Sequence, residues 1–247
     1  MIINILTIFP EMFESVFSAS ILGKAREQGL LSIRLTDIRP YSQSKHKNTD
    51  DYPFGGGAGM VMMAQPIIDA MSDVSAAYPG ARRIFLGPRG KKLTTGLARE
   101  LALEKELILL CGHYEGVDQR ALDACVDEEI SIGDYILTGG ELAAMVLTDC
   151  IARFIPGVLG SAVSPEEESF ADGLLEYPQY TRPRELDGRT VPDVLLSGDH
   201  AKIRAWRRRE SLAATARFRP DLLKSAVLSK SDLIILKELE NSCFSES

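Results

Sequence analysis

The sequence has few cysteines and histidines, the usual zinc ligands, and no segment typical of an export signal or a membrane span. Its four cysteines form no CxxC pair and its three histidines lie far apart, so no zinc-binding spacing is present. No apolar run approaches the roughly 20 residues that cross a bilayer. The opening MIINILTIFPEMFESVF lacks the basic start and cleavage site of a signal peptide. We therefore expect a cytoplasmic protein with no structural metal and no membrane partner.

Three common nucleotide and hydrolase motifs are missing as well. A Rossmann dinucleotide site needs GxGxxG directly after the first strand, but Ile8-Phe-Pro-Glu11 occupies that place. The P-loop motif GxxxxGK[ST] and the GxSxG elbow are not found either. A nicotinamide enzyme, a P-loop nucleotidase and the usual α/β-hydrolase are thus unfavoured.

Charge is distributed unevenly along the chain. The net charge of −7 argues against a nucleic-acid binder, yet residues 200–224 hold eight Lys and Arg against two Asp and Glu. This segment carries +6 and leaves −13 on the rest of the chain. A local basic face can bind phosphates even in an acidic protein. A solvated helix face would give the same pattern.

Strand-like and helix-like segments alternate over residues 1–160. Apolar, β-branched runs predict strands at Ile2–Phe9, Leu31–Ile38, Arg83–Leu86, Leu107–Cys111 and Glu129–Ile132. Apolar spacings of three and four predict helices at Met12–Gln28, Gln65–Ala77, Thr95–Leu103, Asp118–Ala124 and Gly140–Ile151. This alternation is typical of an α/β domain with a largely parallel sheet.

The remainder of the chain has a different character. Residues 161–175 are rich in Ser, Pro, Glu and Gly and have no sustained period, which indicates an interdomain linker or an active-site loop. Residues 176–247 are mainly helical in pattern, most clearly at Ala201–Thr215 and Ser231–Glu240. We expect an α/β domain over 1–160, a linker over 161–175 and a helical domain over 176–247.

Three glycine-bearing turns each follow a predicted strand, at Leu86–Gly90, Cys111–Gly116 and Ile132–Glu141. Ligands of open α/β sheets bind beyond the carboxyl ends of the strands, where glycine allows close approach of the backbone. One such turn is weak evidence, but three from one sheet predict a pocket built mostly of backbone groups. Such a pocket suits adenine and ribose.

A fourth glycine-rich stretch, Asp50–Met60, follows a polar loop instead of a strand. It contains GGGAGM, and so many glycines have little purpose in a packed element. A loop that closes over a substrate is one interpretation, and an idle surface loop is the other.

These segments together resemble a known family. GGGAGM at 55–60, CGHYEG at 111–116, SIGDYILTGGE at 131–141, RFIPGVLG at 153–160, ESFADGLLEYPQYTRP at 168–183 and IRAWRR at 203–208 occur in order. The chain is similar over nearly its whole length to the bacterial tRNA (guanosine-37 N1)-methyltransferases of the SPOUT superfamily. SIGDYILTGGE and the YTRP stretch are the most specific of these motifs.

The resemblance implies a fold and a cofactor site. The sheet domain would contain a trefoil knot, an exception to the rule that chains do not thread loops, followed by a small helical tRNA-binding domain. The knot loops would hold S-adenosylmethionine. The implied cofactor-binding residues are Leu86, Pro88, Gly112, Tyr114, Glu115, Gly116, Ser131, Ile132, Gly133, Asp134, Tyr135, Ile136, Leu137, Gly139 and Gly140.

The resemblance also implies catalytic and substrate-binding residues. Glu168 would be the general base that removes the N1 proton of guanine, and Arg153 would stabilise negative charge on O6. Asp50 would recognise the guanine, and Arg207 and Arg208 would bind tRNA. The enzyme would be a homodimer with shared sites, and a Mg²⁺ requirement is left open.

Two positions depart from the family pattern. Two functions other than guanine-N1 methylation also stay open. Glu168 stands where the family commonly has Asp, with Glu166 and Glu167 beside it as rival acids, and Ala143 stands where Pro is frequent. One alternative is a SPOUT ribose 2′-O-methyltransferase acting on tRNA. The other is an inactive module that binds tRNA or the cofactor.

Overall fold

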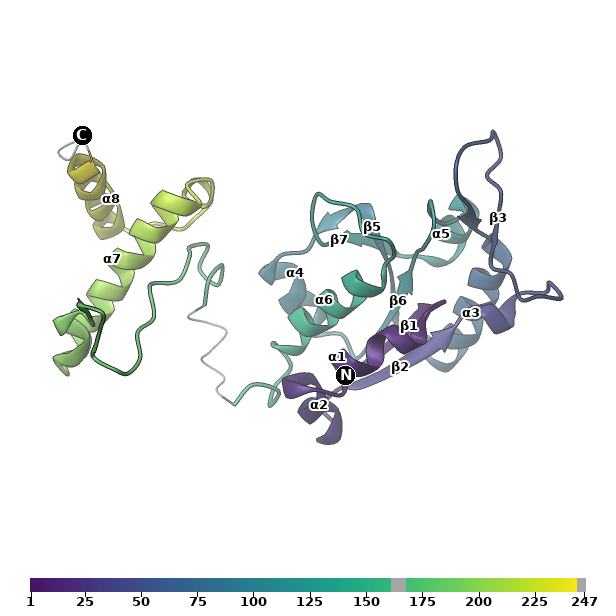
Figure 1. The fold of residues 1–247 in the computed structure, drawn as a ribbon, viewed down its shortest axis with the longest axis horizontal. Helices are drawn as coiled ribbons and strands as arrows, with labels where there is room; N and C mark the ends of the chain where they lie inside the picture. The colour runs from purple at the N-terminus through teal and green to yellow at the C-terminus, as the bar shows by residue number, and fades with distance from the viewer. Residues whose placement is uncertain (161–167, 244–247) are drawn as a thin grey trace. The chain divides into compact units, whose positions relative to one another are not determined.

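The computed structural model describes residues 1–160 and 168–243. The chain divides into two compact units, Met1–Ala162 and Val163–Ser247 (Figure 1). The first unit holds the predicted α/β region and the second the predicted helical region. Of the linker expected at 161–175, residues 161–167 lie outside the described part. No helix among the described residues has the length and apolar character needed to span a bilayer.

The first unit is built on a five-stranded sheet in the order β2-β1-β6-β5-β7, and all four neighbouring pairs are parallel. The strands are β1 Ile2–Thr7, β2 Ser32–Asp37, β5 Arg82–Lys92, β6 Glu106–Cys111 and β7 Glu128–Ser131. They confirm the predicted α/β class and all five predicted strands. The trefoil knot remains a prediction.

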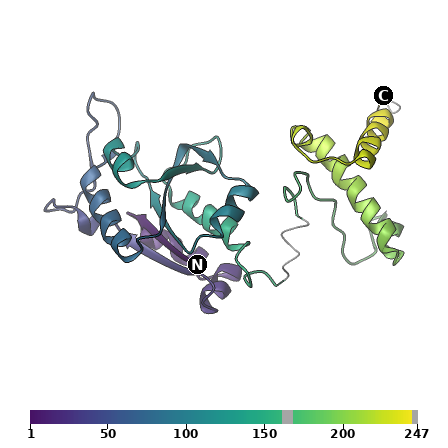
Figure 2. The same cartoon turned by 180° about the vertical axis from the view of Figure 1, so that it is seen from behind.

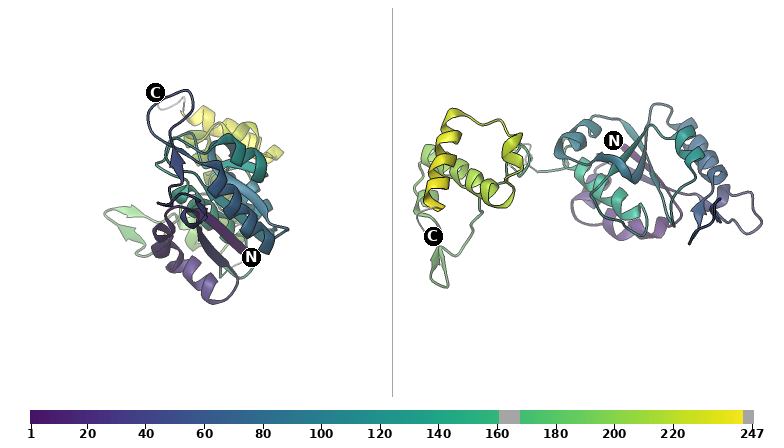
Figure 3. Two further views of the ribbon diagram at one scale, coloured as in Figure 1. Left: turned by 90° about the vertical axis from the view of Figure 1, so that its right-hand side faces the viewer. Right: turned by 90° about the horizontal axis from the view of Figure 1, so that it is seen from above.

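Helices cover both faces of this sheet. On one side, Leu107 and Leu109 of β6 belong to an apolar core with the N-terminal helices α1 Glu14–Phe17 and α2 Ser20–Glu27, and with α4 Thr95–Leu101 and α6 Glu141–Ala152. On the other side, Ile108 and Leu110 pack with α3 Ala64–Ala77 and α5 Gln119–Cys125. Adjacent β6 residues thus face opposite cores, as the period of a strand requires. Figure 2 shows the unit from behind, and in Figure 3 helices flank the strands on both sides.

The helix predicted at Met12–Gln28 is wrong as a single element. The structure has the 3-10 turn η1 Pro10–Phe13, then α1, and then α2 after a break at Ser18 and Ala19. The last carbonyl of α1 has a side-chain partner, because the Arg26 guanidinium donates to the Phe17 carbonyl at 2.7 Å. Gly23 of α2 lies against the Ser18 carbonyl, where a Cβ would come within 2.5 Å.

Strand β5 is longer than the predicted Arg83–Leu86. Both Leu86 and Lys91 pair with Ile130 of β7, so the residues between them bulge out of the strand. A Cβ at Gly90 would lie 2.2 Å from the Glu129 carbonyl carbon, which explains why the chain has glycine where it rejoins β7. The glycine turn at 86–90 is therefore a bulge within a strand and does not end it.

Short elements complete the two units. The first unit adds the 3-10 turn η2 Arg39–Tyr41 and a hairpin of β3 Asp50–Asp51 and β4 Val61–Met62. The second unit contains the hairpin of β8 Glu185–Leu186 and β9 Arg189–Thr190, the turns η4 Asp193–Leu196 and η5 Leu222–Lys224, and the helices α7 His200–Phe218 and α8 Lys230–Cys243. Asp199 caps α7 by accepting from the N–H groups of Ala201 and Lys202.

Candidate functional site

The three glycine turns meet in one pocket of the first unit. One turn is the bulge of β5 and the other two follow the carboxyl ends of β6 and β7, which places the pocket where open α/β sheets bind ligands. Every residue that the sequence assigned to the cofactor lines this pocket except Asp134. The pocket also contains Phe85, Gly87, His113, Ile130, Thr138 and Ala143.

Asp134 lies apart from the other predicted cofactor residues. Its side chain is 89% exposed and pairs with Lys92 at 3.2 Å. The direction of one side chain in an irregular turn is not encoded in the motif that contains it. Of the lining residues that the sequence analysis did not name, Gly87, His113 and Thr138 lie inside the same turns. Phe85 and Ile130 belong to predicted strands, where an apolar residue indicates burial in the core and nothing in the sequence marks it as part of a pocket.

Two of the turns are joined directly through their backbones. The Gly140 N–H donates to the Gly112 carbonyl at 2.7 Å, and His113 forms an isolated bridge with Gly139. A Cβ on Gly140 would lie 2.8 Å from the Cα of Cys111. Glycine at 140 therefore permits a contact between two segments that any side chain would push apart.

A buried acid lies behind these turns. Glu141 is 1% exposed, accepts from the Thr7 hydroxyl at 2.8 Å, and has His113 Nδ1 at 3.7 Å from its other oxygen. It thereby links the end of β1 to the turns after β6 and β7. Burial, with a smaller contribution from this carboxylate, raises the pKa of the Cys111 thiol well above its usual range. Cys111 is therefore a packing residue and not a nucleophile.

The glycine-rich stretch at 50–60 reaches the same pocket. The Glu115 N–H donates to the Met60 carbonyl and the Met62 N–H to the Gly116 carbonyl, each at 2.9 Å. Burial raises the pKa of Tyr114, and the neighbouring Asp50 carboxylate raises it further. The structure thus brings Asp50, the predicted guanine-recognition residue, beside Tyr114 at the edge of the pocket.

The remaining predicted residues fall into two places. Arg153 caps the C-terminal end of α6 in the first unit. Glu168, Arg207 and Arg208 line a common pocket in the second unit, whose other lining residues are Asp172, Leu175, Glu176, Tyr177, Arg204 and Ser211. The Arg207 guanidinium lies 4.7 Å from the centre of the Tyr177 ring, a cation–π contact.

A metal site of the usual composition is not found within residues 1–160 and 168–243. No group of three or more His, Cys, Asp or Glu side chains there could hold an ion. The Mg²⁺ requirement that the sequence left open is not tested by these residues.

Comparison with known proteins agrees with this architecture. Residues 1–225 match the family model described as tRNA (Guanine-1)-methyltransferase TrmD. A tRNA (guanine-N(1)-)-methyltransferase of Alkaliphilus oremlandii is 53% identical over 98% of this chain and 99% of its own length. Proteins of the same name from Clostridium beijerinckii and Geobacillus kaustophilus are 55% and 56% identical, over 97% and 96% of this chain and 99% and 98% of theirs. The chain belongs to the tRNA (guanine-1)-methyltransferase family.

Proposed function

We propose that this chain transfers the methyl group of S-adenosylmethionine to N1 of guanosine 37 in tRNA. The observation that carries the proposal is the pocket formed by three glycine turns of one parallel sheet, in a chain of this family. The relatives are named for methylation of guanine N1 in tRNA, and the basic segment at 200–224 offers a surface for an RNA backbone.

The residues of the pocket fit an adenosyl group. Leu86, Ile132 and Leu137 supply apolar contacts, and the glycines leave backbone N–H and C=O groups accessible for hydrogen bonds to a base and a ribose. A Cβ on Gly133 would come within 2.4 Å of the Tyr135 ring, so glycine allows that ring to fold over its own turn. Glu115 adds a carboxylate to the lining, where a cationic amino group would find a partner.

S-adenosylmethionine, when bound there, supplies a sulfonium methyl group. The protein's own part is to prepare the guanine. N1 must lose its proton, and a carboxylate placed within hydrogen-bond reach can accept it. Glu168 is the proposed base. The negative charge that then develops on O6 is stabilised by a nearby cation, the role proposed for Arg153.

We further propose that the enzyme is a cytoplasmic homodimer in which the cofactor pocket of one subunit works with Glu168 of the other. The exposed side chains of Leu142 and Val146 support a dimer, because they lie one turn apart on α6, which begins at the pocket. Mixing a Glu168→Gln subunit with a Gly140→Val subunit tests the shared site. Shared sites predict that the mixture regains activity, since one site of each mixed dimer is then intact. Two inactive parents that give an inactive mixed dimer contradict it.

The substrate assignment has a direct test. Labelled S-adenosylmethionine is incubated with an unmodified tRNA transcript and with the same transcript carrying adenosine at position 37. The proposal predicts label in the first RNA and none in the second. Equal labelling of both would overturn it.

A further inference from the structure

We propose that Arg208 is a positioning residue, which holds Glu168 in place by clamping the chain that follows it onto α7 and α8. The proposal rests on the function given above, in which Glu168 is the general base. It assigns Arg208 a task different from the tRNA contact implied by the family resemblance.

Glu168 begins a compact turn. The Ala171 N–H donates to the Glu168 carbonyl at 3.1 Å, and the Phe170 N–H donates to the Leu174 carbonyl at 2.7 Å. The Glu176 N–H closes the turn by donating to the Ser169 hydroxyl at 2.9 Å. The backbone position of Glu168 therefore depends on where residues 168–176, here named the base segment, are held.

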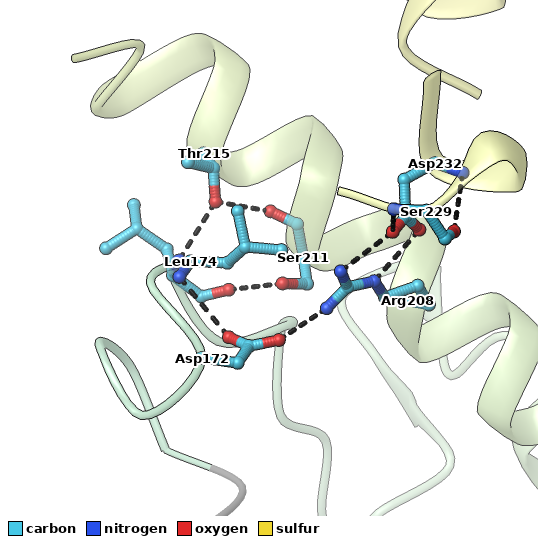
Figure 4. Close-up of polar contacts among 8 residues, drawn as sticks. Asp172, Leu174, Arg208, Ser211, Thr215, Ser229 and Asp232 are labelled. Atoms are coloured by element: carbon cyan, nitrogen blue, oxygen red, sulfur yellow. Dashed lines mark hydrogen bonds and ion pairs between the residues drawn. The ribbon is translucent and has the colours of Figure 1, made fainter. Parts of the chain in front are cut away.

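Helix α7 holds the far end of the base segment. The Leu175 N–H donates to the Thr215 hydroxyl at 2.9 Å, and the Ser211 hydroxyl donates to the Leu175 carbonyl at 2.5 Å (Figure 4). Both hydroxyl-bearing residues are buried. These bonds fix Leu175 but do not reach the residues next to Glu168.

Arg208 supplies the contact closer to Glu168. Its Nη1 donates to Asp172, while its Nε and Nη2 donate to the two carboxylate oxygens of Asp232 at 3.0 and 2.9 Å (Figure 4). Asp232 is 4% exposed and also accepts from the Ser229 N–H at 2.9 Å, at the start of α8. The planar guanidinium thus connects the base segment to a buried, fixed anchor.

The surroundings of Arg208 favour positioning over phosphate binding. Three of its nitrogens donate to carboxylates, and two negative charges flank its single positive charge. A phosphate approaching this group would have to displace an ion pair and face like charge. Arg207, one position earlier, instead lies over Tyr177.

The same helix offers a matched control. Arg209 joins α7 to α8 through Glu238 at 3.1 Å, and it is not among the residues that line the pocket of Glu168. Arg209→Met thus removes an α7–α8 ion pair and leaves the Asp172 contact intact. Asp172→Asn removes the ion pair with Arg208 by changing the other partner. Because the Asp172 side chain is 55% exposed, this substitution should affect the stability of the fold less than a change at Arg208.

The experiment measures kcat, the KM for tRNA and the pH dependence of kcat for the full-length wild type, Arg208→Met, Asp172→Asn, their double variant and Arg209→Met. We expect both single variants to lower kcat roughly 10- to 100-fold, because a base misplaced by about 1 Å loses about that much. The KM for tRNA stays within about twofold of wild type in these two variants, and the double variant is no worse than either single one. Arg209→Met removes a cation of the same basic segment, so its control value is kcat at saturating tRNA, which stays at the wild-type value. The deficit shrinks as pH rises, because a guanine that ionises in solvent no longer needs the base.

Other results would overturn the role proposed for Arg208, and they differ from a failure of the proposed function. A raised KM for tRNA and a flatter salt dependence at normal kcat would show that Arg208 binds phosphate, and would overturn the proposal. A normal kcat in Asp172→Asn would also overturn it, even where Arg208→Met fails to fold. A wild-type protein that methylates no tRNA guanine would instead contradict the proposed function.

Discussion

The backbone N–H of Gly140 donates to the carbonyl oxygen of Gly112 at 2.7 Å, which joins the turn after β7 to the turn after β6. The two turns bring backbone groups to the same pocket from separate strands. Because the sheet fixes both strand ends, the pocket is shaped by main-chain geometry more than by side chains. The proposed cofactor site is therefore sensitive to a single added methyl group.

Gly140→Ala tests this sensitivity. The new Cβ would lie 2.8 Å from the Cα of Cys111, so the turns must separate. We expect the free energy of unfolding to fall by about 1–3 kcal/mol, and affinity for S-adenosylmethionine to fall more than tenfold by calorimetry. Gly80→Ala is the control, since a Cβ there meets nothing within 4 Å. Wild-type affinity in Gly140→Ala would show that the turns need not touch.

Glu168→Gln tests the proposed base. Loss of a general base should lower the rate of methyl transfer by roughly 10²–10⁴, while cofactor affinity stays unchanged because Glu168 lies outside the three glycine turns that form the cofactor pocket. Raising the pH should recover part of the rate, and Glu168→Asp should keep much of it. Single-turnover assays give these rates.

Glu166 and Glu167, which lie outside the described residues, provide the controls for this substitution. Gln at either position should leave the rate near that of wild type. An active Glu168→Gln beside an inactive control would move the base by one or two residues.

Arg207→Ala tests the RNA surface of the second unit. Removing one phosphate contact should weaken tRNA binding and lower the slope of log affinity against log salt by about one. Cofactor affinity should not change. Arg120→Ala, which breaks an exposed ion pair with Asp118 in the first unit, should leave the salt slope unaltered. An unchanged slope in Arg207→Ala would mean that this arginine does not contact the RNA backbone.

Asp232→Asn tests the anchor of the clamp through pH. The pKa of Asp232 is lowered from 3.8 to about 2; the hydrogen bond from Arg208 is the largest cause, and bonds from Ser229 lower it further. A lowered folded-state pKa gives stability that is present above about pH 4 and is lost as pH falls toward 2. We expect the variant to be less stable by about 2 kcal/mol at pH 7, with a difference that shrinks between pH 4 and pH 2.

Fluorescence of Trp206 is the probe for that measurement, because it is the only tryptophan and belongs to α7. Urea titrations of both proteins at each pH give the difference directly, since other carboxylates titrate in both. A gap that stays constant from pH 7 to pH 2 would contradict the ion pair.

The strands of the sheet could be predicted from the sequence, because the signals for strands and turns are local. Runs such as Leu107–Cys111 are buried on both faces, and glycine turns follow the ends of β6 and β7. The break in the first helix had no such signal, since neither Gly nor Pro marks Ser18. It depends on Arg26 and Gly23 meeting the end of α1 in three dimensions.

Part of the candidate site could likewise be predicted from local sequence, and part could not. Residues in the glycine turns could be assigned from their motifs, because the chain itself carries them to one edge of the sheet. The partners of Arg208 could not, since Asp172 and Asp232 lie 36 and 24 residues away in sequence. Such ion pairs depend on how the segment after Glu168 packs against two helices, and no local pattern contains that information.

The most direct test of the central claim is the identity of the methylated nucleoside. Unmodified tRNA is treated with the protein and S-adenosylmethionine, digested to nucleosides and analysed by mass spectrometry, with the modified position located by fragment mapping. The account predicts 1-methylguanosine at position 37 and at no other position. A ribose-methylated nucleoside, a methyl group on another base, or no methylation by a folded protein that binds the cofactor would contradict it.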